Sequence, residues 1–251
     1  MKRFIVFLTL AVLPVAAANA KSHVVNSPNG KLTAVVESGE KLAWSLSYDG
    51  QMLVNPSEVS MTLDDGVVYG GSQKVIREVR KAFDRTIDAV NYKKAQVADR
   101  YNELTLKFKE FSIVLRAYDD AFAYRFISHA KSPFKVVSEK AEFSFPADWN
   151  MYVGYVCQNL QTLETQLFNS HENTYEYQPL TQWNKERLAF TPLMVEVPDG
   201  IKLCVMEADL LNYPGMYLYN SDADARLEGV FAKYPKTLEQ GGHNRLQMLV
   251  K

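Results

Sequence analysis

Cysteine and net charge are both scarce in this chain, and each shortage excludes a class of protein. The sequence has two cysteines, Cys157 and Cys204, in 251 residues, so it is not a disulfide-stapled scaffold. These cysteines could form one bridge in an oxidising compartment or stay as two free thiols. The formal net charge is -1, so the sequence gives no indication of a nucleic-acid partner or an anionic membrane surface.

Motifs for the common catalytic chemistries are also missing. None of the histidines lies in a G-x-S-x-G or H-E-x-x-H context, and there is no glycine-rich phosphate loop. The cysteines are not at zinc-ligand spacing. These absences argue against a serine-histidine-aspartate triad, a zinc site and a phosphate-binding loop. The four histidines to which the first of these absences applies are His23, His129, His171 and His243.

The one long apolar run stands at the start. Met1-Lys-Arg is positive, Phe4–Ala17 is almost wholly apolar, and Ala18-Asn-Ala20 has the small-x-small pattern of a signal-peptidase site. We therefore predict a signal peptide over residues 1–20 and a domain over 21–251 that is periplasmic or secreted. The run is short for a membrane span and no second one follows, so no membrane association is expected after cleavage.

Period-two alternation dominates the rest of the chain and predicts an all-β fold. Leu42, Trp44, Leu46 and Tyr48 alternate with small or polar residues, as in a strand with one buried face. The other segments that we expect to be strands are an antiparallel meander over Tyr101–Pro146, a hairpin formed by Thr191–Val197 and Ile201–Glu207, and a last strand at Leu246–Val250.

Three stretches are less regular. Asn55-Pro56 is expected to break a strand ladder, because proline cannot donate to it. Residues 73–98 are predicted to form extended edge segments and loops rather than a helix, since their β-branched content disfavours a helix. Ala147–Glu172 is expected to be a loop. The chain stops within its last predicted strand, which suggests a fragment or the first domain of a longer protein.

The candidate site is Tyr175-Glu176-Tyr177. A carboxylate braced by two aromatic rings can ligate a metal or contact a sugar, but it can equally be the outward residue of an ordinary strand. Calcium takes about six to eight oxygen ligands, so one glutamate would need ligands from elsewhere. Aromatic residues make up 12% of the chain, which suits sugar stacking and core filling alike.

Several short strings, in this order and spacing, resemble the N-terminal domain of glycoside hydrolase family 97, the Bacteroides-type α-glucosidases and α-galactosidases. The strings are Ser27-Pro-Asn-Gly30, Tyr101-Asn-Glu-Leu104, Ile113-Val-Leu-Arg116, Asp119–Phe126, Tyr175-Glu176-Tyr177, Thr191-Pro192, Glu207–Leu210 and Tyr213–Leu218. One departure is Ala121, where the family has glycine.

The resemblance implies a β-supersandwich similar to galactose-mutarotase-like domains, in an enzyme of polysaccharide utilisation. It implies a (β/α)₈ barrel partner that carries the catalytic carboxylates beyond Lys251, so that this chain has none. It also implies that Glu176 joins glutamates of the barrel in binding calcium beside an α-linked oligosaccharide. The residues that bind the substrate stay unassigned.

Two other hypotheses remain open. A free-standing carbohydrate-binding β-sandwich could use Trp149 and Trp183 as stacking residues. A mutarotase-like epimerase would need a histidine and a glutamate on one face, and His171 with Glu172 or Glu176 is the nearest set in the sequence.

Overall fold

The structure is a computed structural model. It describes residues 20–156, 162–168, 172–222, 224–240 and 246–249. Its regular structure is almost entirely antiparallel strand, which confirms the predicted all-β class. The predicted signal peptide lies outside the described residues except for Ala20. Within the described part of the chain, no helix has the length and apolar content needed to cross a membrane.

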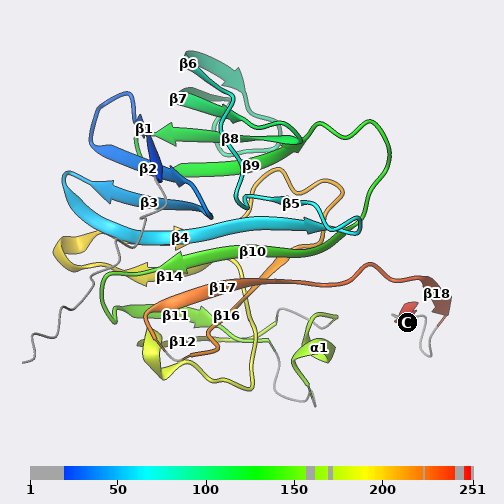
Figure 1. The fold of residues 1–251 in the computed structure, drawn as a ribbon. Coiled ribbons are helices and arrows are strands. Elements are labelled where there is room, and N and C mark those ends of the chain that lie inside the picture. Colours follow the sequence, from blue (N-terminus) through cyan, green and yellow to red (C-terminus); the bar gives the residue numbers. More distant parts are fainter. Residues whose placement is uncertain (1–19, 157–161, 169–171, 223, 241–245, 250–251) are drawn as a thin grey trace, which may run out of the picture.

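A nine-stranded sheet crosses the middle of the molecule (Figure 1). It combines early and late strands of the chain, because β10 pairs with β4 on one side and with β17 on the other. In spatial order the strands are β1 (Lys21–Asn26), β2 (Leu32–Ser38), β3 (Leu42–Tyr48), β4 (Gln51–Leu63), β10 (Val136–Ser144), β17 (Arg226–Phe231), β16 (Met216–Tyr219) and β13 (Ala189–Phe190), with β5 (Val68–Tyr69) paired to β4.

Two four-stranded sheets complete the layers, one toward the top of Figure 1 and one toward the bottom. The first, called the β6 sheet, has the order β6 (Arg77–Asp88), β7 (Gln96–Lys107), β8 (Phe111–Tyr118) and β9 (Phe122–Ser128). The second, called the β12 sheet, has the order β12 (Tyr175–Pro179), β11 (Asn150–Gly154), β14 (Leu193–Glu196) and β15 (Lys202–Val205). The remaining elements are α1 (Leu163–Gln166), two 3₁₀ turns (Leu180–Gln182 and Pro198–Gly200) and the hairpin of β18 (Thr237–Gln240) and β19 (Leu246–Leu249).

One continuous core joins the three sheets. Leu104 of the β6 sheet, Val36 of the central sheet and Met151 of the β12 sheet are all buried in the same apolar cluster. Each fully buried side chain of this kind contributes roughly 1.5–3 kcal/mol through removal from water. Because the two smaller sheets each bury one face in this core, the architecture is the expected β-supersandwich.

Two expectations about strand boundaries were wrong. The meander predicted to reach Pro146 ends at Ser128, because β10 leaves it and pairs with β4 and β17. Alternation indicates a buried face but does not identify the neighbouring strand. Pro56 also does not end a strand, since β4 runs through it. It lies where the ladders to β3 and β10 both shift register, and such irregularities tolerate proline.

Of the predictions for the other two irregular stretches, one is confirmed and one is wrong in part. The extended reading of residues 73–98 is confirmed, because β6 is an edge strand that pairs with β7 along its whole length. Its charged side chains suit an exposed edge. The loop expected over Ala147–Glu172 is wrong for residues 150–154, which form β11 inside the β12 sheet, and for Leu163–Gln166, which form α1. Residues 157–161 and 169–171 of this stretch lie outside the described residues.

Candidate functional site

Glu176 lies on β12, the outer strand of its sheet, opposite Val153 of β11. Its side chain is 48% exposed and therefore stays outside the apolar core. Successive residues of a strand point to opposite faces, so Tyr175 and Tyr177 stand on the other side of β12. The expectation that these rings brace Glu176 is therefore wrong.

The described partner of Glu176 is Arg187, whose Nη1 lies 3.6 Å from Glu176 Oε1. Arg187 is buried, and its guanidinium carbon lies 4.8 Å from the centre of the Tyr155 ring. Its Nε and Nη2 both donate to the carbonyl oxygen of Val156. The guanidinium is thus held by backbone and ring contacts that do not involve Glu176. Sequence analysis missed Arg187, because a charged residue in Asn184-Lys-Glu-Arg187 looks like part of a solvated loop.

The Tyr155 side chain supports the pair of Glu176 and Arg187. Its hydroxyl oxygen accepts hydrogen bonds from Gln178 Nε2 at 2.8 Å and from the Asn184 backbone N–H at 2.9 Å. Burial raises the pKa of Tyr155, and the nearby Glu176 carboxylate adds to that rise. The phenol therefore stays neutral, and it fastens β12 to the segment that carries Arg187.

The donors around Glu176 are too few to hold a metal ion by themselves. Among the described residues, no group of three or more histidine, cysteine, aspartate or glutamate side chains could hold a metal. One exposed carboxylate is compatible with calcium where further oxygens come from another module or from water. Glu176 fits such a shared site, because it lies at a sheet edge that a neighbouring module can reach.

The two tryptophans of the carbohydrate-binding hypothesis are not arranged for stacking, and the epimerase hypothesis is not tested by the described residues. Trp183 is buried and donates its ring N–H to the Arg187 carbonyl oxygen at 3.0 Å. Trp149 is half-buried and packs against the core near Phe145. Neither tryptophan offers the open face for sugar stacking that the sequence suggested. His171, needed by the epimerase hypothesis, lies outside the described residues.

A histidine-carboxylate pair does occur, at a place that sequence motifs did not indicate. His23 Nδ1 lies 2.9 Å from Glu78 Oε1, and its Nε2 lies 2.9 Å from Ser38 Oγ. Ser38 and His23 are 8% and 1% exposed, so a substrate has no direct access to them. The contacts join β1 and β2 of the central sheet to β6, which is a structural role.

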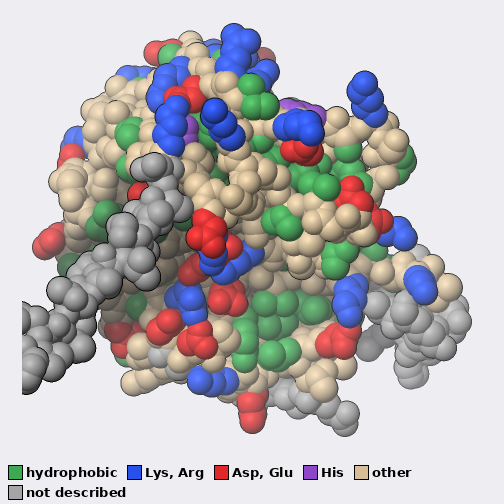
Figure 2. All heavy atoms as spheres, in the orientation of Figure 1, with side chains coloured by type: hydrophobic (Ala, Val, Ile, Leu, Met, Phe, Trp, Pro, Cys, Tyr) green, Lys and Arg blue, Asp and Glu red, His purple; other side chains and the backbone are tan. Residues whose placement is uncertain are grey.

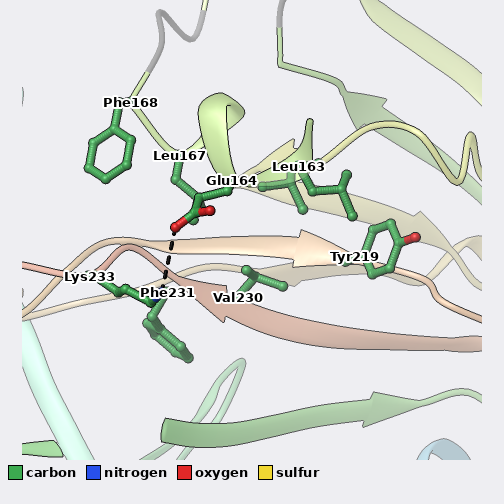
Figure 3. Close-up of a pocket in the computed structure, with 9 residues that line it drawn as sticks. Leu163, Glu164, Leu167, Phe168, Tyr219, Val230, Phe231 and Lys233 are labelled. Carbon is green, nitrogen blue, oxygen red and sulfur yellow. Dashed lines mark ion pairs between the residues drawn. The ribbon is translucent and has the colours of Figure 1, made fainter. Parts of the chain in front are cut away.

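A groove-like cavity of about 280 Å³ opens between α1 and strands β16 and β17 (Figure 3). Leu163, Leu167 and Phe231 supply much of its apolar lining, and Glu164 pairs with Lys233 across it at 3.5 Å. None of the residues around Glu176 lines it. On the face of the molecule drawn in Figure 2, acidic and basic side chains are interspersed, in keeping with the small net charge.

Comparison with known proteins decides the family. The model of the glycosyl-hydrolase 97 N-terminal family matches residues 25–243, which is most of the chain. The chain belongs to this family. The predicted family resemblance and the fold are therefore both confirmed.

Relatives of this family 97 N-terminal domain are longer than the chain. A protein of Bacteroides thetaiotaomicron described as a retaining alpha-galactosidase is 42% identical over 98% of the chain, which spans 38% of that protein. A family 97 enzyme from Pseudoalteromonas sp. strain K8, solved with acarbose, is 18% identical and superposes with a TM-score of 0.69 over 83% of this chain and 32% of its own. A beta-arabinopyranosidase superposes with a TM-score of 0.71 at 20% identity, over 89% of this chain and 37% of its own. The two solved structures support the fold alone.

Proposed function

We propose that this chain is the non-catalytic N-terminal domain of an exported, calcium-dependent α-glycosidase. It supplies Glu176 as one calcium ligand and forms part of the wall of the sugar site, while the catalytic carboxylates lie on a (β/α)₈ barrel. The observation that carries this proposal is the exposed carboxylate of Glu176 at the outer strand of the β12 sheet. Two further facts support it: the relative described as a retaining alpha-galactosidase, and the 38% of that protein that the chain spans.

The chain's own residues position this ligand. Arg187 and Tyr155 hold β12 against the segment that precedes β13, and Arg187 orients the Glu176 carboxylate from the protein side. Bound calcium would act as a Lewis acid that polarises an oxygen of the substrate or of a water molecule.

The test uses the polypeptide that includes the catalytic module, with Glu176→Gln as the variant. Glutamine keeps the size of the side chain but loses its charge, so calcium affinity should fall by roughly tenfold or more, with activity reduced in parallel. Terbium luminescence measures metal binding directly, and thermal unfolding checks that the fold is intact. Glu186→Gln, one residue from Arg187 and exposed, is the matched control. Unchanged metal affinity in Glu176→Gln would contradict the proposal.

A free-standing carbohydrate-binding protein is the second candidate. Tyr152, Tyr175 and Tyr177 are 36%, 52% and 51% exposed on the β12 sheet, in place of the tryptophans first considered. Calorimetric titration of the 251-residue chain with α-linked oligosaccharides distinguishes the two candidates. Binding by the isolated chain favours this second candidate, and no binding favours the first.

A further inference from the structure

A row of uncharged side chains crosses the outer face of the β12 sheet. Tyr177 pairs in register with Tyr152, Tyr152 with Met194, and Met194 with Cys204, so the row takes one residue from each of the four strands. We call these four residues the tyrosine row. The opposite face of the same sheet is buried in the core through Met151, Val195 and Val205.

The tyrosine row is open to solvent in this chain. Tyr177 and Tyr152 are 51% and 36% exposed, Cys204 is exposed, and Met206 beyond β15 is 64% exposed. Single exposed apolar residues are normal on protein surfaces, but a contiguous set marks an interaction site. The arrangement across four strands is therefore the feature that needs an explanation.

The β6 sheet provides an internal comparison. It also has four strands, and its corresponding outer row is Lys81, Glu103, Arg116 and Ala123, again paired in register. Arg116 Nε donates to Glu103 Oε2 at 3.0 Å, so this row is charged and internally paired. An aromatic row lies beside it, but the Arg116 guanidinium carbon lies 4.6 Å from the centre of the Tyr101 ring, and Tyr101 is buried. The charged side chains of the β6 sheet thus cover rings on this face, whereas the rings of the tyrosine row are exposed.

A polar border runs beside the tyrosine row. The Tyr177 hydroxyl donates to Glu196, which also pairs with Lys202, and Asn150 Nδ2 donates to the Tyr177 oxygen at 3.0 Å. The Tyr152 and Tyr177 rings lie 4.7 Å apart at an angle of 45°. Fixed aromatic residues beside a polar rim are the usual anatomy of a protein–protein interface.

We infer that the tyrosine row is the surface on which a further module of the same polypeptide packs. This inference rests on the proposed function for the identity of that module. The relatives extend far beyond the matched region, which is 38% of one and 32% of another, so they contain such a module. Glu176 and Tyr177 point to opposite faces of β12, but β12 is the edge strand of its sheet, so a module that wraps this free edge contacts both side chains. A sugar fits this face less well, since the two rings are tilted and the Tyr177 hydroxyl is already engaged.

Cys204 is a built-in probe of this surface. The experiment compares thiol alkylation in the 251-residue chain and in the polypeptide with the following module, with Cys157→Ser in both. The control thiol is Ala123→Cys combined with Cys204→Ser, at the equivalent edge position of the β6 sheet. Partial burial raises the pKa of the Cys204 thiol even though the residue is exposed, so its alkylation rate differs from that of the control thiol. The ratio of the Cys204 rate to the control rate is therefore compared between the two proteins. This ratio should be at least about tenfold lower in the longer protein, because a packed interface must open before the thiol reacts.

Several results would overturn the inference. The first is a ratio of the Cys204 rate to the control rate that is the same in both proteins. The second is protection of Cys204 that rises with protein concentration, which would indicate a second copy of the chain. The third is protection of Cys204 that needs an added α-linked oligosaccharide. Tyr152→Lys in the longer protein should restore labelling of Cys204, since a charge in the row opposes packing. Repeating the labelling with a calcium chelator separates the two proposals. Protection that persists while Glu176→Gln binds metal normally leaves the interface standing without the calcium role.

Discussion

Arg187 Nη1 lies 3.6 Å from Glu176 Oε1, so a buried cation faces a half-exposed carboxylate across the edge of the β12 sheet. The cation is fixed by the Val156 carbonyl oxygen and the Tyr155 ring, whereas Glu176 keeps much of its surface in solvent. Glu176 is therefore the member of the pair that is free to take an additional partner.

Arg187→Ala should destabilise the domain by about 2–4 kcal/mol, because it removes a buried cation and leaves the Val156 carbonyl oxygen without two of its donors. Chemical denaturation of both proteins measures the difference. Arg85→Ala is the control: Arg85 is 60% exposed and pairs with Asp99 on the surface, so its loss should change stability much less than the loss of Arg187. Equal effects from the two substitutions would show that Arg187 is not structural.

Gly154→Ala should destabilise the domain by about 1–3 kcal/mol, because a Cβ atom there would lie 2.4 Å from the Phe190 ring. Phe190→Leu in the same protein should recover part of that loss, which a double-mutant cycle would detect. Gly71→Ala is a suitable control, since its nearest neighbour would be at an ordinary 3.6 Å. Additive effects of Gly154→Ala and Phe190→Leu would contradict the predicted clash.

Glu78→Gln should weaken the domain at neutral pH and lose that effect in acid. Partial burial raises the pKa of Glu78, but hydrogen bonds from His23 and Lys21 outweigh it and hold the pKa below its ordinary value. The stabilisation is therefore present above the ordinary carboxyl pKa of about 4.3 and is lost as the pH falls through the lower folded-state value. Urea unfolding between about pH 3 and pH 7 should show the wild-type and variant stabilities converging in acid. Glu40→Gln, at an exposed carboxylate, serves as control, and parallel curves for Glu78→Gln would refute the prediction.

Glu139→Gln should have the opposite pH dependence. Burial raises the pKa of Glu139 and the Glu207 carboxylate adds to this, while the hydrogen bond donated by Tyr213 opposes it. A raised folded-state pKa favours folding in acid, and that contribution is lost as the pH rises through it. The variant, which cannot ionise, should therefore gain stability relative to the wild type as the pH rises above the ordinary carboxyl pKa of about 4.3.

Tyr213→Phe tests the same hydrogen bond by removing its donor instead of changing its acceptor. It removes the donor to the carboxylate and so raises the pKa of Glu139 further, and the total loss of stability with rising pH should become larger than in the wild type. A stability difference between Glu139→Gln and wild type that stays constant over this pH range would count against the assignment.

Local pattern predicted much of the fold. The alternation of Leu42, Trp44 and Leu46 correctly indicated a strand with one buried face, and the hairpin of β14 and β15 follows the expected turn. Local pattern could not show that β10 joins the central sheet, because the neighbours of a strand are chosen by the fit of distant segments.

The candidate site was less accessible to sequence reasoning. Alternation alone left Glu176 as an ordinary strand residue, and only the family resemblance singled it out. Arg187 acts on the carbonyl oxygen of Val156, which lies 31 positions away, and no local pattern encodes that contact. The same reason hid the contacts of His23 with Ser38 and Glu78, which are 15 and 55 positions distant.

The position of β10 also governs how the domain is made. Glu142 on β10 accepts a hydrogen bond from the Glu58 backbone N–H, 84 positions earlier, and pairs with Arg226, 84 positions later. The central sheet therefore cannot close until synthesis has passed β17, and such non-local pairing makes folding slow. During that interval the nascent chain keeps unsatisfied strand edges, which make it prone to aggregation and a substrate for chaperones.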